Sequence, residues 1–317
     1  MPSVNQLRLP SLPNSSSASV KPALALALLC LVWGYAWVVL KIALQYAGVF
    51  DFTGLRTVAS TVLLFIIVIA MRRPLRINAW RAAVVVGTLQ TGGFLLFSMW
   101  ALSLGGAGRT SVLVYTMPFW TLIFARLILG ERMRGLQWVA VILAFCGLML
   151  IVAPWDMQGT LSASLSAVTA GALWSLGTVM GKKMMPKDSI DLLTFSAWQM
   201  LVAAVPLAIA AWLVPSSPVQ WNTELVVCFL YATVLGSVLG WFLWFYVLNH
   251  MAAGVATLNA LAIPVIAVTS AWLQLGERPP AHELAGMLLI GAGLALLGAL
   301  ALSQSRIANP GPPSAAA

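Results

Sequence analysis

The sequence predicts an all-α polytopic membrane protein whose ten transmembrane helices form two inverted five-helix repeats. Two observations carry this prediction: the composition is too apolar for a water-soluble domain, and one pattern of residues occurs twice. Of the 317 residues, 61% are hydrophobic and only 8% are charged, whereas a soluble domain carries about 25% charged residues. Most of the surface is therefore expected to face lipid rather than water.

The repeated pattern fixes the two halves. Residues 107–132 (AGRTSVLVYTMPFWTLIFARLILGER) correspond without a gap to residues 253–278 (AGVATLNALAIPVIAVTSAWLQLGER). Both segments begin with Ala-Gly, carry a central proline and end in Gly-Glu-Arg. The prolines, Pro118 and Pro264, show the constant offset in numbering between the two copies (264 − 118 = 146). An internal repeat of this length predicts that one half of the fold is built twice.

A second match lies upstream, because Trp33 and Lys41 correspond to Trp174 and Lys182 at a slightly smaller offset (174 − 33 = 141). A transmembrane helix needs about 20 apolar residues, and ten runs qualify. They cover about 23–44, 52–71, 80–103, 108–129, 135–153, 163–182, 191–213, 224–248, 254–275 and 282–302. Five spans in each half is an odd number, so the second half must cross the membrane in the opposite sense.

These runs predict four segments: a disordered tail over 1–22, a first five-helix repeat over 23–153, a second, inverted repeat over 154–302, and a disordered tail over 303–317. If the N-terminus is inside, thirteen Lys and Arg residues lie on the inner face and four on the outer face. Because cytoplasmic loops collect basic residues, we expect both termini in the cytoplasm and the protein in the cytoplasmic (inner) membrane. The net charge of +9 forms no stripe for nucleic acid.

The polar chemistry excludes several classes of function. Three cysteines lie singly in apolar runs, which predicts neither a disulfide framework nor a metal site. The eight acidic residues and both histidines lie in loops or at span ends. A proton relay at the bilayer midplane, a nucleophile–base pair and a metal cluster are therefore not expected. We expect no enzyme activity and no cofactor.

The two prolines predict paired hinges. Pro118 and Pro264 each lie in the middle of a span, where proline removes a backbone hydrogen bond, and transporter sites are built from such interrupted helices. The alternative is a membrane proline whose neighbours restore the lost bond. Glu131 and Glu277 end the same two spans and are candidate gate residues. Their alternative is an exposed helix end, where an ion pair contributes at most about 1 kcal/mol.

Aromatic and uncharged polar residues near mid-span predict a central cavity between the halves, since such groups face the protein interior. The candidate substrate-binding residues are Trp33, Trp37, Lys41, Arg56, Gln90, Trp100, Tyr115, Trp174, Trp241 and Asn259. The alternatives are aromatic belts at the membrane surface and, for the two cations, snorkelling to the outer surface. The cations favour a substrate with a carboxylate, such as an amino acid, whereas the aromatic lining favours a flat or cationic compound. The glycine-rich spans over 135–153 and 282–302 predict close packing or a homodimer.

Taken together, the two halves resemble the EamA-type transporters of the drug/metabolite transporter superfamily. The motif WGYAWVVLKIAL at 33–44 is similar to that family's first span, and residues 107–132 to its fourth. The resemblance covers about 23–302, and it implies ten helices and the transport, commonly export, of amino acids, other metabolites or drugs. The sequence departs from the family at 277–280, where Glu-Arg-Pro-Pro replaces the frequent Glu-Pro.

The leading hypothesis is a secondary transporter, an exporter or facilitator of small metabolites, that works by alternating access in the lipid bilayer. The alternatives are an exporter of drugs or aromatic cations and a membrane receptor that transports nothing.

Overall fold

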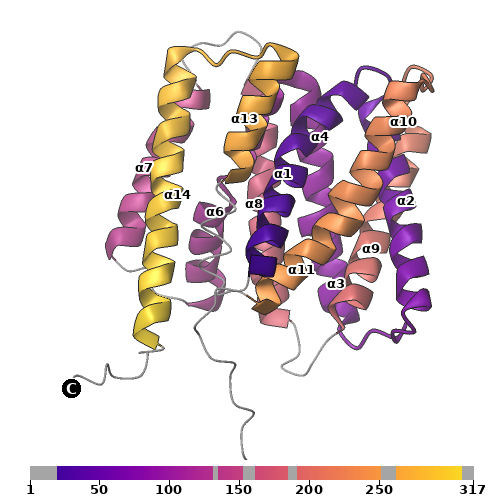
Figure 1. Ribbon diagram of the computed structural model, residues 1–317, viewed down its shortest axis with the longest axis horizontal. Coiled ribbons are helices and arrows are strands. Elements are labelled where there is room, and N and C mark those ends of the chain that lie inside the picture. Colours follow the sequence, from indigo (N-terminus) through magenta and orange to yellow (C-terminus); the bar gives the residue numbers. More distant parts are fainter. Residues whose placement is uncertain (1–19, 131–134, 153–160, 185–190, 251–261, 309–317) are drawn as a thin grey trace, which may run out of the picture.

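The computed structural model describes residues 20–130, 135–152, 161–184, 191–250 and 262–308. Within these residues the regular secondary structure is helical, without strands, and the helices run side by side (Figure 1). In these described ranges, eight helical segments are long and apolar enough to cross a membrane. Two shorter apolar helices, Gly135–Ile151 and Ala262–Leu275, accompany them. The chain is therefore a multi-pass helical membrane protein.

The first half contributes spans that match the apolar runs closely. They are α1 (Val20–Ala43), α2 (Val49–Ala70), α3 (Trp80–Val86), the π-helix η1 (Gly87–Gly93), α4 (Phe94–Leu104), α5 (Ala107–Val114), α6 (Met117–Phe124), the π-helix η2 (Ala125–Leu129) and α7 (Gly135–Val152). The third span is thus α3, η1 and α4 in succession, and the fourth is α5, α6 and η2. We call the end of the bundle where α4 meets α5 the Gly105 end; it is uppermost in Figure 1.

The second half of the chain supplies the remaining described elements. Its described elements are α8 (Leu161–Met184), α9 (Leu192–Leu213), α10 (Thr223–Leu230), the π-helix η3 (Tyr231–Leu239), α11 (Gly240–His250), α13 (Ala262–Leu275) and α14 (Ala281–Ala308). The last helix reaches Ala308, beyond the predicted end of the final span at 302, and α1 includes Val20, before its predicted start at 23.

Two π-helical segments interrupt equivalent spans. The segment η1 ends at Gly93 and η3 ends at Leu239, positions that correspond by the offset of the repeat (239 − 93 = 146), and an α-helix of 11 residues follows each. The wider turn is visible in the bonding of Ser237, whose hydroxyl donates to the carbonyl of Ala232, five positions earlier, at 3.0 Å. Such segments are rare and are frequent at functional sites.

The fourth span breaks at Tyr115 and Thr116, between α5 and α6. Pro118 explains the break, because it lacks an N–H and its ring would clash with a helix that continued through it. By restarting at Met117, the chain places Pro118 in the first turn of α6, where no N–H is needed. Pro264 lies in α13, near the edge of the described residues at Ala262.

Helix α8 supports the carbonyls at this break. The Ser175 hydroxyl donates to the carbonyl of Met117 at 2.7 Å, and Gly171 lies so close to Val114 that an added Cβ would be 2.7 Å from the Val114 carbonyl oxygen. The same proximity recurs in the other half, where a Cβ on Gly34 would lie 3.0 Å from the carbonyl oxygen of Ile263. By the two offsets of the sequence repeat, Gly34 corresponds to Ser175 and Met117 corresponds to Ile263.

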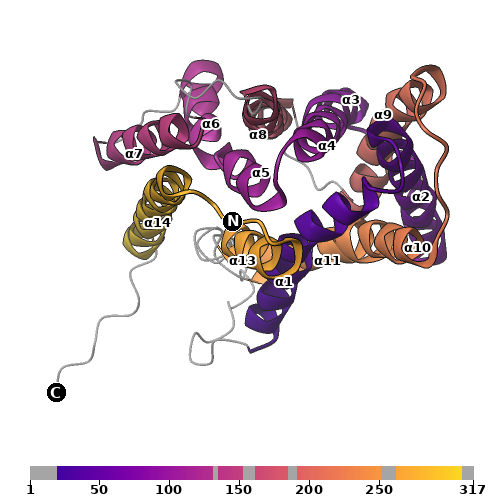
Figure 2. The same cartoon turned by 90° about the horizontal axis from the view of Figure 1, so that it is seen from above.

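Helices α7 and α14 pack side by side at one edge of the bundle (Figure 2). Their crossing is set by Gly147 and Gly286: a Cβ on either glycine would lie 2.6 Å from the carbonyl oxygen of the other. The pair that corresponds to it in the repeat is also close, since a Cβ on Gly293 would lie 2.9 Å from the Ala140 carbonyl oxygen. These glycines therefore pack the two helices of one chain against each other.

We expect Gly147→Ala to destabilise the protein, because the new methyl group must push α7 and α14 apart. Overpacking of this kind costs about 1–3 kcal/mol. Gly291→Ala in α14 is the matched control, since no atom lies within 4 Å of its added Cβ. Thermal unfolding of both purified variants in detergent measures the difference. Equal stability of the two would contradict the close crossing.

Candidate functional site

Four tryptophans from three spans form a cluster in the interior. We define the tryptophan cluster as Trp33 of α1, Trp174 of α8, and Trp241 and Trp244 of α11. The ring planes of Trp174 and Trp241 are nearly parallel, at 9°, with centroids 5.9 Å apart. Trp33 meets Trp241 edge-on, with ring centroids 6.1 Å apart, and its ring is tilted by 38° against that of Trp244 at 6.2 Å. Because α1 belongs to one half of the chain and α8 and α11 to the other, the cluster joins the halves.

A carbonyl of the π-helix η3 holds Trp33 in place. The indole N–H of Trp33 donates to the carbonyl of Gly236 at 2.9 Å. Gly240, at the start of α11, leaves the space for the ring, since an added Cβ would overlap the Trp33 indole nitrogen and lie 3.0 Å from its Cε2 atom. In the equivalent place in the other half, Phe94 packs against Trp174 with ring centroids 4.8 Å apart.

The break between α5 and α6 lies beside the tryptophan cluster. Tyr115, at the break, packs with Trp33 and Trp244 on one group of buried apolar side chains that includes Leu29 and Ile263. A site at this position therefore has aromatic faces on one side and irregular backbone on the other. Interrupted helices near mid-span are the usual place for a transporter's substrate.

The two predicted cations have different surroundings. The Lys41 ammonium donates to the carbonyls of Leu102 and Gly105 at 2.7 and 2.6 Å, so it caps the C-terminal end of α4. The Arg56 side chain is partly buried in α2 and makes no hydrogen bond or ion pair within the described part of the chain. Arg56 is thus a cation inside α2 whose hydrogen-bonding capacity is not used by the described part of the chain.

Contacts between the halves close the Gly105 end. The Tyr35 hydroxyl donates to Oε1 of Gln274 at 2.7 Å, and its ring meets that of Tyr231 edge-on at 5.8 Å. The Tyr231 hydroxyl donates to the carbonyl of Val32 at 2.8 Å. These contacts tie α1 to η3 and to the end of α13.

Glu277 binds the N-terminus of α5. Its carboxylate accepts the backbone N–H groups of Ala107 at 2.8 Å and Gly108 at 3.1 Å. A helix N-terminus has unpaired N–H groups and a positive dipole end, so it favours an anion. The preceding Gly276 has a φ of +69°, which glycine adopts at no steric cost and which turns Glu277 toward α5. The predicted gate residue therefore joins the end of the ninth span to the start of the fourth.

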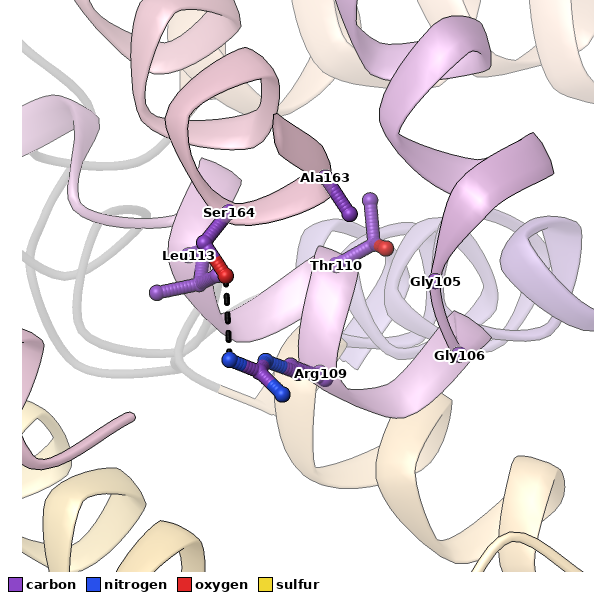
Figure 3. A pocket seen from close by; sticks show the side chains of 7 residues that line it. All are labelled: Gly105, Gly106, Arg109, Thr110, Leu113, Ala163 and Ser164. Carbon is purple, nitrogen blue, oxygen red and sulfur yellow. Dashed lines mark hydrogen bonds between the residues drawn. The ribbon is translucent and has the colours of Figure 1, made fainter. Parts of the chain in front are cut away.

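Next to this contact, Arg109 of α5 binds three groups. Its guanidinium pairs with Oε1 of Glu283 at 2.6 Å and donates to the Ile151 carbonyl at 2.6 Å and to Oγ of Ser164 at 3.0 Å. The two charged side chains are only 15% and 10% exposed. A small pocket lies beside the guanidinium, lined by Gly105, Gly106, Arg109, Thr110, Leu113, Ala163 and Ser164 (Figure 3).

The remaining predicted residues have other surroundings or lie outside the described chain. Trp37 is buried in the main apolar core. Trp100 is 41% exposed and pairs with Phe50. Gln90 lies in η1 with its backbone against Gly177 of α8. Glu131 and Asn259 lie outside the described residues.

Several residues of the site were not among the sequence-based candidates. Trp244 and Phe94 contribute rings to the cluster, and Gly236 and Gly240 hold Trp33. The GxxxG spacing of the two glycines indicates only helix packing, so nothing in the pattern assigns them to an indole. No group of three or more potential metal-ligating side chains gathers in the described part of the chain.

Comparison with known proteins gives consistent results. The family model of the EamA-like transporter family matches this chain twice, over residues 20–153 and 161–299. A relative named "Uncharacterized transporter YoaV" from Bacillus subtilis is 28% identical over 87% of this chain and 96% of its own length. A "Probable amino-acid metabolite efflux pump" from Salmonella typhimurium is 25% identical over 84% of this chain and 91% of its own length.

A solved crystal structure has the same fold, with a TM-score of 0.63 at 18% identity, covering 90% of this chain and 99% of the other. The resemblance to the drug/metabolite transporter superfamily is confirmed by the two matches of the family model. This chain belongs to the EamA-like transporter family, whose members are membrane transporters rather than enzymes by name.

Proposed function

We propose that the protein is a secondary transporter that exports small metabolites, or lets them flow down their gradient, across the cytoplasmic membrane by alternating access. Its ten helices form two inverted repeats with both termini in the cytoplasm. The substrate binds at the tryptophan cluster, beside the break between α5 and α6. The observation that carries the proposal is that both halves supply this cluster, as expected for a site at a repeat interface.

The recurrence of contacts supports an inverted repeat. The crossing of Gly147 with Gly286 has its equivalent in Gly293 and Ala140, which are the corresponding positions of the other copy. The distribution of basic residues between the two faces supports the orientation. In that orientation the Gly105 end is extracellular.

The cycle follows from the contacts between the halves. Glu277, Arg109 and Tyr35 hold the Gly105 end shut in this conformation, so the site would open first toward the cytoplasm. Opening of the Gly105 end requires these contacts to separate, and the break before Pro118 lets α5 and α6 move independently. By the repeat, Glu131 plays the part of Glu277 on the cytoplasmic side.

Two substrate classes have separate support. Metabolites derived from amino acids are favoured by the name of the relative from Salmonella typhimurium and by Arg56, which could bind a carboxylate. Flat aromatic cations are favoured by the half-buried rings of the tryptophan cluster, because indole is the best ring for cation–π contact. The second class makes the protein a drug exporter.

Trp174→Leu tests the site. The variant loses the parallel contact with Trp241 and the edge contact with Phe94, and we expect counterflow in proteoliposomes to fall about tenfold or more, since aromatic pairs contribute about 0.5–1.5 kcal/mol each beyond their buried area. Trp212→Leu, at a side chain 83% exposed, is the matched control and should keep full activity. The assay compares amino acids with aromatic cations.

Unchanged counterflow in Trp174→Leu would remove the tryptophan cluster from the substrate pathway. Ligand binding by the wild-type protein without any flux would instead identify a receptor.

A further inference from the structure

The contacts at the Gly105 end fall into two classes: those whose residues recur at the equivalent positions of the other half, and those whose residues do not. Both partners of the Glu277 contact have identical counterparts in the other half of the sequence. Glu131 corresponds to Glu277, and Ala253-Gly254 corresponds to Ala107-Gly108. The ion pair between Arg109 and Glu283 differs in this respect.

The residues equivalent to this ion pair carry no charge. The position that corresponds to Arg109 is Val255 (255 − 109 = 146), and the position that corresponds to Glu283 is Gln137 (283 − 137 = 146). A valine and a glutamine cannot form an ion pair, so the two sides of the membrane are not equal. The opposite end has a different ion pair between the halves, Arg73 with Asp191 at 3.4 Å, but the side chains of that pair are 51% and 19% exposed. The pair at the Gly105 end is shorter and more shielded, and an exposed pair contributes at most about 1 kcal/mol.

The surroundings make this difference large. The guanidinium of Arg109 has its partners in three elements, at Glu283 of α14, Ile151 of α7 and Ser164 of α8, at distances of 2.6 to 3.0 Å. Both charged side chains are shielded from solvent. In such a shielded place the attraction between opposite charges is much stronger than in water. Separation of α5 from these helices loses this attraction together with the two other hydrogen bonds of the guanidinium.

We propose that the Arg109–Glu283 ion pair acts as a one-sided latch, which makes the conformation closed at the Gly105 end the resting state of the empty transporter. The proposal rests on the alternating-access function. In the orientation given above, the empty site then faces the cytoplasm, where an exporter collects its substrate. A difference in free energy between the two conformations changes their populations by the corresponding Boltzmann factor, so loss of the pair must raise the fraction open at the Gly105 end.

Labelling of a single cysteine measures that fraction. Thr110 lies on α5 next to Arg109, is 2% exposed, and lines the pocket at this end, so Thr110→Cys reports its opening to a membrane-impermeant thiol reagent. The native cysteines, Cys30, Cys146 and Cys228, are first replaced by alanine. Glu283→Gln in this background should raise the labelling rate about tenfold or more. Arg109→Met should raise it as well, and the two changes together should add little to either alone.

Two further variants separate the latch from general stability. The charge exchange Arg109→Glu with Glu283→Arg should restore slow labelling, because it rebuilds the pair. Gln137→Met changes the equivalent position of the other half and should alter the labelling rate by less than about twofold. An unchanged rate in Glu283→Gln, or an equal rise in Gln137→Met, would overturn the proposal. Because labelling needs no flux, the result is independent of substrate: fast labelling of Glu283→Gln supports the latch even if no transport occurs.

Discussion

Replacement of Gly240 by alanine is expected to reduce transport at least about tenfold. The new methyl group would occupy the place of the Trp33 indole nitrogen, so the ring must leave its position. It would then lose both the hydrogen bond to Gly236 and its edge contact with Trp241. Forced shifts in a packed interior cost about 1–3 kcal/mol. The initial rate of counterflow, normalised to reconstituted protein, measures the effect.

Gly236→Ala is the matched control in the same span, because its added Cβ would only touch the Tyr231 carbonyl oxygen at 3.6 Å. It should keep most of the activity. Trp33→Phe, which keeps a ring but loses the N–H, should fall between the two. If Gly240→Ala were as active as Gly236→Ala, the position of Trp33 would have no bearing on transport.

Glu277→Gln is expected to lower the rate of transport about tenfold or more. The carboxylate accepts two backbone N–H groups of α5 with its two oxygens, whereas an amide has one acceptor oxygen and would turn its NH2 group toward an N–H. Hydrogen bonds to a charged group contribute about 1.5–3 kcal/mol each, and the helix N-terminus favours the negative charge. We therefore expect incomplete closure of the Gly105 end, measured as a slower saturated rate in proteoliposomes.

Glu224→Gln serves as the comparison for charge alone. Its carboxylate accepts a hydrogen bond from Tyr46 near the start of α10 but does not bind the N-terminus of α5. This variant should retain transport within about twofold. A loss in Glu224→Gln as large as that in Glu277→Gln would indicate that net charge, rather than the contact with α5, sets the rate.

The sequence predicts the broad fold well because lipid imposes a simple rule. A span must be apolar over about 20 residues, so the ends of the runs lie close to the ends of the helices for most spans. Three of the mid-span tryptophans chosen from the sequence, Trp33, Trp174 and Trp241, lie in contact, while the cavity itself stays a prediction. Both results depend on side-chain type and spacing alone.

The finer features depend on neighbours that only the folded chain supplies. Lys41 has the appearance of a substrate-binding cation in the sequence, yet its ammonium is bound by two carbonyls at the end of α4. Trp100, like Trp174, is an aromatic residue within a predicted span, but its side chain is 41% exposed and packs beside Phe50. The hydropathy of a span does not indicate these partners, because the carbonyls bound by Lys41 and the ring beside Trp100 belong to other spans of the chain.

The wide turns of η3 also have a consequence for how α11 is oriented. A π-turn holds roughly one residue more than an α-turn, and each residue of an α-helix advances it by about 100°. Trp241 and Trp244 follow η3 directly. A helical wheel drawn continuously from Thr223 would therefore point both indoles about a quarter-revolution or more away from the direction they take. The direction of the side chains around the helix axis therefore shifts at η3. The periodicity of apolar residues has to be assessed separately before and after this segment.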